Sequence, residues 1–232
     1  MKLFDDYVNN YGFDNEKIEL KYHHSYRVQS LCEMLAKDLQ LSERDVYIAS
    51  LAGLFHDIAR FKQISEYNTF LDMNSFDHGD LGADIFKNEF ASQFDLSDEE
   101  QMIIYKAIKH HNKLAIGQDV NERELLFCKI VRDADKIDIL YLYGSNSHLP
   151  GKTDGEVNDE CHKSFMDKKS IAHEYVTNGT EKNVAALASY WDLNFALSKK
   201  IIRDNEYFQK IEKVLNNDIY TKYFKLIYED LR

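Results

Sequence analysis

The sequence is poor in residues that force turns, with one proline and nine glycines among 232 residues. Scarcity of both favours helices, because proline breaks a helix and glycine weakens it. The sequence also lacks an apolar run of the about 20 residues that a membrane-spanning helix needs. An acid already stands at Asp5, so the N-terminus has no apolar core typical of a secretory signal. We therefore expect a cytoplasmic protein that does not bind a membrane.

Positive charge and paired cysteines are scarce as well. The chain has 29 Lys and Arg residues against 40 Asp and Glu residues, a formal net charge of −11. A basic surface for a nucleic-acid duplex is therefore not expected, although a nucleotide can still enter a pocket that holds local cations or a metal. Cys32, Cys128 and Cys161 lie far apart and form no C-x-x-C pair, which is typical of reduced, packed thiols.

Apolar and aromatic side chains are sufficient for a core, at 44% and 13% of residues. Apolar positions recur every three or four residues through most of the chain, which is typical of amphipathic helices. Ser42 precedes one such stretch, running to about Phe61, and Ser97 precedes another, so both are expected N-caps. The sequence therefore predicts an all-α protein.

The composition changes once along the chain, where Gly, Ser, Asn and the only proline gather. We expect a loop or small insertion there, near residues 144–180. The C-terminal part, 181–232, is expected to form helices over about 181–203 and 205–231. Because no other linker or repeat is evident, we expect a single helical domain over residues 1–232.

Five predicted helices each carry one or two metal-capable side chains on the face that continues their apolar stripe. Any one of them alone is more often a hydrogen-bonded core residue or part of a solvated face, but their joint inward placement favours a shared metal. Imidazole and carboxylate suit divalent Mn, Fe, Co, Ni or Zn, and the lack of thiolates argues against a structural zinc finger. The candidate ligands are His24, His56, Asp57, His78, His110, His111 and Asp135.

These residues fall in five ordered motifs that resemble those of the HD-domain metal-dependent phosphohydrolase superfamily, and more narrowly its small stand-alone bacterial members. The motifs are H-x-x-R-V at 24–28, H-D-I-A-R at 56–60, H-x-x-x-G-A at 78–83, H-H-N-K at 110–113 and R-D-A-D-K-I-D at 132–138. The resemblance implies an HD-domain-like helical bundle with the metal site in a cleft between core helices. One departure is Ala59, where many relatives have glycine; alanine is small and favours a helix.

The resemblance also implies how one or two ions would be held. The first ion would be bound by His24, His56, Asp57 and Asp135. In relatives with two ions the aspartate of the H-D pair bridges them, and the second site would be completed by His78, His110 and His111. Asp133 lies on another side of its helix from Asp135 and is expected at the surface.

The expected activity is hydrolysis of a phosphomonoester or nucleotide by metal-activated water. Arg60, Lys113 and Lys136 are the expected substrate-binding cations, since guanidinium and ammonium groups bind phosphate. Asp57, Arg60 and Lys136 are also expected to be catalytic, together with Asp138, which would orient a histidine N–H or the attacking water. Simple surface ion pairs of Arg60 and Lys136 are the alternative roles.

Two other functions stay open at this point. The same ligands suit an HD-fold di-iron oxygenase, and they also suit a non-catalytic sensor that binds a metal or a nucleotide. The expected partner is a small phosphorylated substrate, such as a nucleotide. Its identity, the native metal and the oligomeric state are left open.

Overall fold

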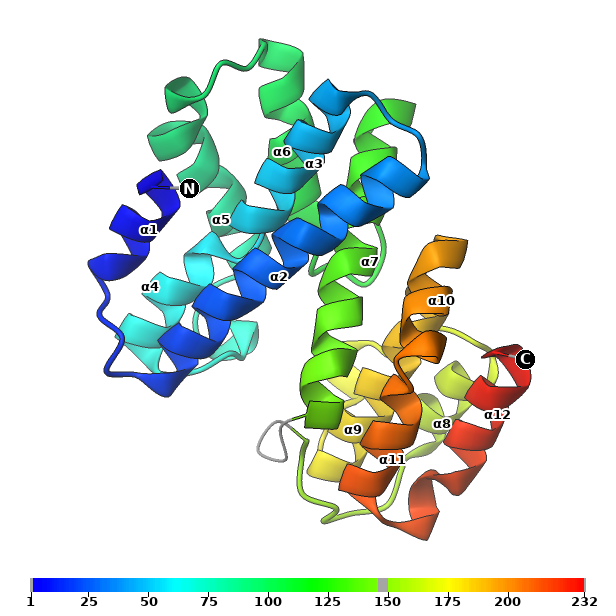
Figure 1. The fold of residues 1–232 in the computed structure, drawn as a ribbon. Helices are drawn as coiled ribbons and strands as arrows, with labels where there is room; N and C mark the ends of the chain where they lie inside the picture. The colour runs from blue at the N-terminus through cyan, green and yellow to red at the C-terminus, as the bar shows by residue number, and fades with distance from the viewer. Residues whose placement is uncertain (1, 146–149, 232) are drawn as a thin grey trace. The chain divides into compact units, whose positions relative to one another are not determined.

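The computed structural model describes residues 2–145 and 150–231, and its regular elements are helices (Figure 1). No strand occurs among these described residues, so the prediction of an all-α fold is confirmed. Whereas the sequence predicts one domain over residues 1–232, contacts divide the chain into two compact units, before and after the Asp135–Lys136 peptide bond. Helix α7, Glu122–Ser145, contains this boundary.

The N-terminal unit consists of six helices, α1 to α6, and the first part of α7. Their bounds are Lys2–Asn9 for α1, Glu16–Asp38 for α2, Glu43–Phe55 for α3, Ile58–Tyr67 for α4, His78–Ile85 for α5 and Asp98–His110 for α6. Short helical turns occupy Asp72–Asn74, Phe86–Phe90 and Ala91–Gln93. Helices α2 and α3 lie side by side and share the largest contact between helices of this unit (Figure 1).

Capping side chains explain where these helices begin. Ser42 Oγ accepts the N–H of Asp45 at 3.1 Å, and Ser97 forms a reciprocal capping box with Glu100. Both predicted N-caps are therefore confirmed. Asn15 caps α2 in the same way. Each cap satisfies a backbone N–H that has no partner within the helix.

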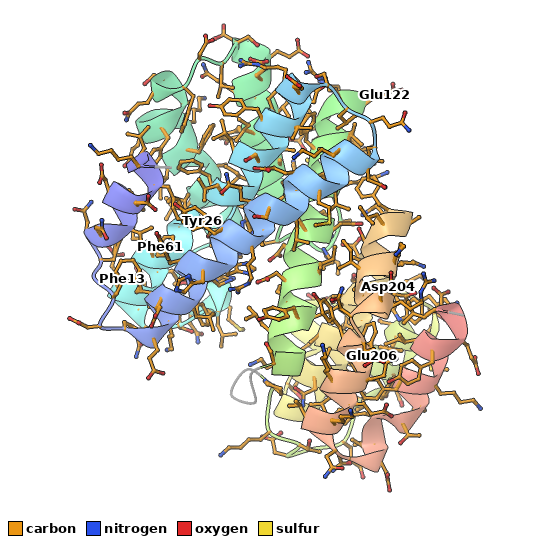
Figure 2. All side chains as sticks on the ribbon, in the orientation of Figure 1. Phe13, Tyr26, Phe61, Glu122, Asp204 and Glu206 are labelled. Atoms are coloured by element: carbon orange, nitrogen blue, oxygen red, sulfur yellow. The ribbon has the colours of Figure 1, made fainter. Side chains whose placement is uncertain are left out.

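An aromatic cluster holds α1 against the rest of the unit. The ring of Phe4 is fully buried, and the rings of Tyr26, Phe55 and Phe61 meet it edge-on, with centroid distances of 5.7, 5.7 and 5.8 Å. Figure 2 labels Tyr26 and Phe61 among the side chains of this unit. Edge-to-face pairs of this kind contribute beyond their buried area. The cluster joins α1 to α2, α3 and α4, three of the helices that carry or flank the candidate site.

In the described residues 136–145 and 150–231, the C-terminal unit consists of the rest of α7 and five further helices. They are α8 at Asp159–Met166, α9 at Gly179–Ala188, α10 at Ala196–Asp204, α11 at Tyr207–Leu215 and α12 at Thr221–Leu231. Short 3-10 turns occupy His173–Tyr175, Ser189–Asp192 and Asp218–Tyr220. Trp191, the only tryptophan of the chain, packs edge-on against Phe165 at a centroid distance of 5.7 Å.

Two long final helices, over 181–203 and 205–231, are a wrong prediction, because this region is divided into four shorter α-helices. The 3-10 turn at Ser189–Asp192 interrupts the first predicted helix, and Asn216, left-handed with φ 37°, interrupts the second. Glu206, left-handed with φ 55°, lies next to the predicted gap between the two helices. The loop or insertion expected near 144–180 contains helix α8, and its residues 146–149 lie outside the described part of the chain.

Within residues 2–145 and 150–231, no helix combines the length and the apolar character that crossing a bilayer requires.

Candidate metal centre

The His-Asp pair lies at a break between two helices. Helix α3 ends at Phe55 and α4 begins at Ile58, so the single helix predicted to about Phe61 is wrong at this point. Asp57 occupies the N-cap position of α4, with φ −105° and ψ 18°, but its side chain makes no capping bond. Neighbours on a regular helix diverge by about 100°. The break instead lets His56 and Asp57, 0% and 2% exposed, face one centre.

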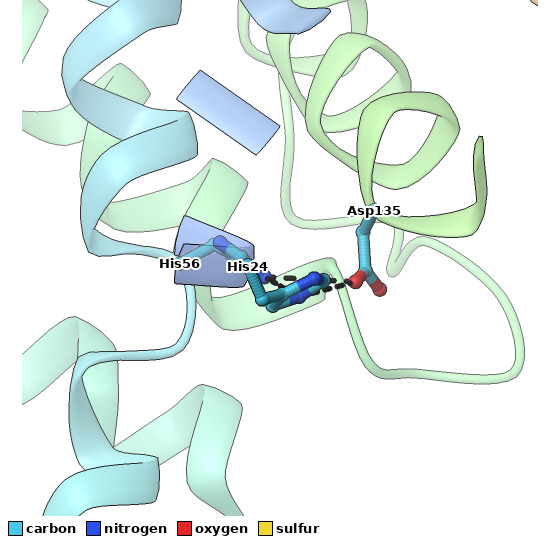
Figure 3. Close-up of side chains that lie close together, drawn as sticks. All are labelled: His24, His56 and Asp135. Carbon is cyan, nitrogen blue, oxygen red and sulfur yellow. Dashed lines mark hydrogen bonds and ion pairs between the residues drawn. The ribbon is translucent and has the colours of Figure 1, made fainter. Parts of the chain in front are cut away.

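One oxygen of Asp57 faces a first group of donor atoms. The Nε2 atoms of His24 and His56 lie 3.1 Å apart, and each is 3.4 Å from Asp57 Oδ2. Asp135 Oδ1 lies 3.2 Å from Nε2 of His24 and 3.6 Å from Nε2 of His56. Figure 3 shows both rings directed towards the Asp135 carboxylate. Helices α2, α3 and α7 thus bring together residues that are more than a hundred positions apart in sequence.

The other oxygen of Asp57 faces a second group. The Nε2 atoms of His78 and His111 lie 3.0 Å apart, and each is 3.4 Å from Asp57 Oδ1. His78 is the first residue of α5, and His111 directly follows α6. The Asp57 carboxylate therefore stands between two pairs of imidazoles, with one oxygen towards each pair.

The tautomers of these histidines leave their lone pairs pointing inward. His56 Nδ1 lies 2.7 Å from the carbonyl oxygen of Gly53, and His111 Nδ1 lies 2.6 Å from that of Ile108. A carbonyl oxygen only accepts, so each Nδ1 carries a hydrogen, and in the neutral ring each Nε2 keeps a lone pair. His78 Nδ1 is likewise 2.6 Å from Asp72 Oδ2. Lone pairs that face one another at 3.0 Å repel unless a cation lies among them.

The donor set therefore fits divalent metal ions. Donors bound at right angles to one ion, at about 2.1 Å, lie about 3 Å apart. The separations of 3.0 to 3.6 Å in both groups are close to that value. The donor atoms of His24, His56 and Asp135 are close enough together to hold one ion, and so are those of His56, Asp57 and His111, so His56 of the first group also lies close to His111 of the second.

The shifted pKa values of Asp57 and His78 favour the forms that bind a metal ion, a charged carboxylate and a neutral imidazole. Burial opposes ionisation of Asp57, but Lys21 and His56 outweigh it and hold the pKa of that carboxyl well below its usual range. Burial and the Arg60 cation lower the pKa of His78 to about 3, so its ring is neutral. Burial also disfavours the charged form of His56, yet Asp57 and Asp135 raise its pKa to about 9, so a proton is held there when no ion is bound.

Of the seven predicted ligands, the structure places His110 outside the two groups. Its Nε2 lies 3.1 Å from Asp119 Oδ1, and its Nδ1 accepts the N–H of Gly117 at 3.4 Å. His110 and His111 are consecutive at the end of α6, so their side chains point in different directions and one of the two faces Asp57.

The predicted substrate cations of the N-terminal unit are held by acids and carbonyls. Arg60 Nη1 donates to the Phe70 carbonyl at 2.7 Å and to Asp72 Oδ1 at 2.9 Å, while its Nε lies 3.6 Å from Asp57 Oδ1. Lys113 pairs with Asp77, the N-cap of α5, and with Asp80 at 3.1 Å. Arg60 is thus next to the candidate centre.

Lys136 and Asp138 belong to the C-terminal unit. Lys136 Nζ lies 2.8 Å from Asp192 Oδ2, and Asp138 is 2% exposed. Asp133 is 0% exposed, so its expected surface position is wrong. The reason is that α7 is buried on several sides here, with Ile130 and Ala134 also fully buried.

Three residues next to the centre are missing from the sequence prediction. Lys21 Nζ lies 2.5 Å from Asp57 Oδ2, and Asp72 accepts from His78. Arg132 donates to the carbonyls of His110 and His111, at 2.8 and 3.2 Å, and so fixes the end of α6. Lys21 has a sequence signal, because it precedes His24 by three positions and shares its helix face. Asp72 lies in an irregular segment and has none.

A comparison with protein families matches residues 22–140 to the HD domain. The match covers about half of the chain and includes every residue of the two donor groups. No curated protein and no solved structure matched the chain.

Proposed function

Because this chain belongs to the HD domain family, a family of metal-dependent hydrolases, we propose that it hydrolyses small phosphate esters with the help of one or two divalent transition-metal ions. The observation that carries the proposal is the Asp57 carboxylate, whose two oxygens each face a separate pair of imidazole nitrogens at 3.4 Å. A carboxylate placed in this way suits a bridge between two ions, about 3.5 to 4 Å apart in two-metal sites.

The ligands divide between the two positions. The first ion would be held by His24, His56, Asp57 Oδ2 and Asp135, and the second by Asp57 Oδ1, His78 and His111. When bound, such ions polarise phosphoryl oxygens and lower the pKa of a coordinated water towards neutrality. The main-chain carbonyls of Gly53 and Ile108 keep the rings of His56 and His111 in the tautomer that this binding needs.

The charges around the centre support an anionic substrate. The carboxylates next to the imidazoles are Asp57, Asp135 and Asp72, and the cations next to these carboxylates are Lys21, 2.5 Å from Asp57, and Arg60, 2.9 Å from Asp72. Two divalent ions would outweigh these three carboxylates, and Lys21 and Arg60 add to the excess of positive charge. A phosphate ester or a nucleotide compensates this positive charge, whereas a neutral substrate does not. Lys21, 13% exposed, is our candidate for stabilising the substrate anion.

The test is phosphate release from a library of phosphomonoesters, nucleotides and sugar phosphates. The full chain would be stripped with a chelator and reloaded separately with Mn²⁺, Fe²⁺, Co²⁺, Ni²⁺ or Zn²⁺. We expect metal-dependent release that is equal with and without oxygen, and that falls at least about 1,000-fold in Asp57→Asn, because the bridge is lost. The matched control is Asp204→Asn, which removes an exposed carboxylate paired with Lys200 in the C-terminal unit.

Two results would contradict the proposal in different ways. Turnover that requires oxygen and releases no phosphate would support the di-iron oxygenase. Nucleotide binding that is lost in Asp57→Asn, without phosphate release by the wild type under any metal, would support the sensor.

A further inference from the structure

His56, His78 and His111 of the two donor groups are not oriented by the same kind of group. His56 and His111 bond to carbonyls three residues earlier in their own chain segments, Gly53 and Ile108. These acceptors are fixed by helices α3 and α6. His78 bonds to the side chain of Asp72, six residues away in the segment between α4 and α5. The second donor group therefore depends on a side chain that the first group does not use.

The carboxylate of Asp72 is held from several sides. Its Oδ1 accepts from Arg60 Nη1 at 2.9 Å and from Gln63 Nε2 at 3.0 Å. Its Oδ2 accepts from His78 Nδ1 at 2.6 Å and from Asn112 Nδ2 at 3.2 Å. The carboxylate is thus the meeting point of α4, α5 and the segment that follows α6, although Asp72 itself lies in a single 3-10 turn.

Arg60 and Gln63 connect this turn to α4. Arg60 Nη1 also donates to the Phe70 carbonyl, and its guanidinium lies 5.8 Å from the centre of the Phe70 ring. Gln63 is fully buried and donates to Ser75 Oγ at 2.7 Å. Arg60 Nε is buried without a hydrogen-bond acceptor and faces Asp57 Oδ1 at 3.6 Å. The same guanidinium therefore neighbours both the Asp57 carboxylate and the Asp72 carboxylate.

We infer that Asp72 is the positioning residue of the second ion's site, with Arg60 and Gln63 holding Asp72 in place. By accepting the Nδ1 hydrogen of His78, Asp72 fixes the tautomer and directs Nε2 towards Asp57 Oδ1, and its charge makes the imidazole a stronger ligand. The first ion's site keeps its own supports. Arg60 then acts through Asp72 and is not a phosphate ligand. The inference rests on the proposed function, because it concerns the same centre.

The test measures metal binding by the full chain rather than activity alone. Mn²⁺ would be titrated into the wild type, Asp72→Ala and Asp72→Asn by equilibrium dialysis, with electron paramagnetic resonance to distinguish coupled pairs of Mn²⁺ from isolated ions. We expect two ions and a coupled spectrum for the wild type. In Asp72→Ala the second dissociation constant rises by about 10-fold to 100-fold, the coupled signal fades, and the first constant stays within about threefold.

Asn74→Ala is the matched control, because Asn74 is an exposed residue of the same 3-10 turn. It is expected to bind Mn²⁺ as the wild type does. Asp72→Asn keeps the size of the side chain, so it tests the role of the charge even if the alanine variant fails to fold. Adding Asp72→Ala to a His78→Ala chain is expected to have no further effect on Mn²⁺ binding, because the ligand that Asp72 orients is already gone.

The outcomes separate this inference from the proposed function. Wild-type stoichiometry, affinities and spectrum in both Asp72 variants would overturn the inference, while phosphate release by the wild type would leave the proposed function standing. If the wild type binds two ions but releases no phosphate from any ester, the proposed function fails. Loss of the second ion in the Asp72 variants would then still support the positioning role.

Discussion

Lys21 is a cation next to the Asp57 carboxylate, and it lies outside the five sequence motifs. Lys21 donates to Asp57 Oδ2 at 2.5 Å and lies 5.7 Å from the centre of the Phe70 ring. Because the ammonium group adds positive charge next to the Asp57 carboxylate, we expect Lys21→Met to lower kcat/KM for a phosphate ester by about 10-fold to 100-fold. Steady-state kinetics at several salt concentrations measures the loss, and Lys21→Arg is expected to restore part of it.

Lys17→Met is the matched control for this substitution. Lys17 lies one turn earlier on α2 and donates to the carbonyl and the side chain of Asn68, at 2.7 and 2.8 Å. The Lys17→Met substitution is expected to change kcat/KM by less than about threefold. Equal losses in the Lys17 and Lys21 variants would show a general effect of positive charge on this helix and would contradict a specific role for Lys21.

At the scale of helices, the approach of α5 to α6 sets the position of His78. A Cβ atom added to Gly79 would lie 2.3 Å from Asn112 Oδ1 and 2.9 Å from the Lys109 carbonyl oxygen. The carbonyl cannot move without shifting α6. We expect Gly79→Ala to lower the free energy of unfolding by about 1–3 kcal/mol, as overpacking does, measured by urea denaturation.

Gly82→Ala, on the same helix, provides the comparison. Its added Cβ would meet the Ile108 side chain at 3.3 Å, a contact that a small movement of the methyl group relieves. We expect a smaller loss than for Gly79→Ala. A larger loss at Gly82 would mean that α5 and α6 approach most closely at another point than the structure indicates.

The start of α6 gives a prediction about pH. Arg44 and the Ser97 N–H bond to Glu100 and lower the pKa of its carboxyl from 4.5 to about 2. A lowered pKa stabilises the fold above the unfolded-state pKa, and this stabilisation is lost as the pH falls through the folded-state value. We therefore expect the wild type to exceed Glu100→Gln in stability at pH 6, and the difference to shrink between about pH 4.5 and pH 2. Chemical denaturation at each pH measures it.

Ser97→Ala tests the other half of the same capping box. Removing a capping hydroxyl costs about 1 kcal/mol, and this cost is expected at pH 6 in the same denaturation experiment. Because Glu100 also bonds to Arg44 at 2.7 Å, its pH dependence is expected to persist in the Ser97 variant in weaker form. A pH-independent difference between the wild type and Glu100→Gln would contradict the ionic origin of the effect.

At the scale of the whole molecule, metal binding is expected to stabilise the fold. The donor groups bring several lone pairs together in a buried place, and an ion removes their repulsion. At a free ion concentration 100 times the dissociation constant, we expect the free energy of unfolding to rise by about 2.7 kcal/mol. Thermal unfolding with a chelator and with added Mn²⁺ measures this rise. His56→Ala, which removes one ligand, is expected to abolish most of it, and an equal rise in that variant would argue for binding elsewhere.

Much of this arrangement follows from helical periodicity. His24, His56 and Asp135 continue apolar stripes, so their inward direction could be predicted. The choice between His110 and His111 could not, because it depends on where α6 ends and on its rotation. Asp72 was beyond prediction, since it lies in an irregular segment and its role is set by partners on α4, at the start of α5 and after α6. The interruptions within the two final predicted helices were also missed, because they depend on the 3-10 turn at Ser189–Asp192 and on the left-handed residue Asn216.

Helix α7 runs from the unit that holds the donor groups into the unit that holds the only tryptophan. Asp135, beside the imidazoles of the N-terminal unit, is followed directly by Lys136 of the C-terminal unit, and the only tryptophan, Trp191, belongs to that second unit. Tryptophan fluorescence, excited selectively over tyrosine, therefore reports on the half of the chain that contributes no member of the donor groups. If a diamagnetic ion such as Zn²⁺ shifts this emission, its binding is felt beyond the half that coordinates it, and the continuous backbone of α7 is one route for that signal.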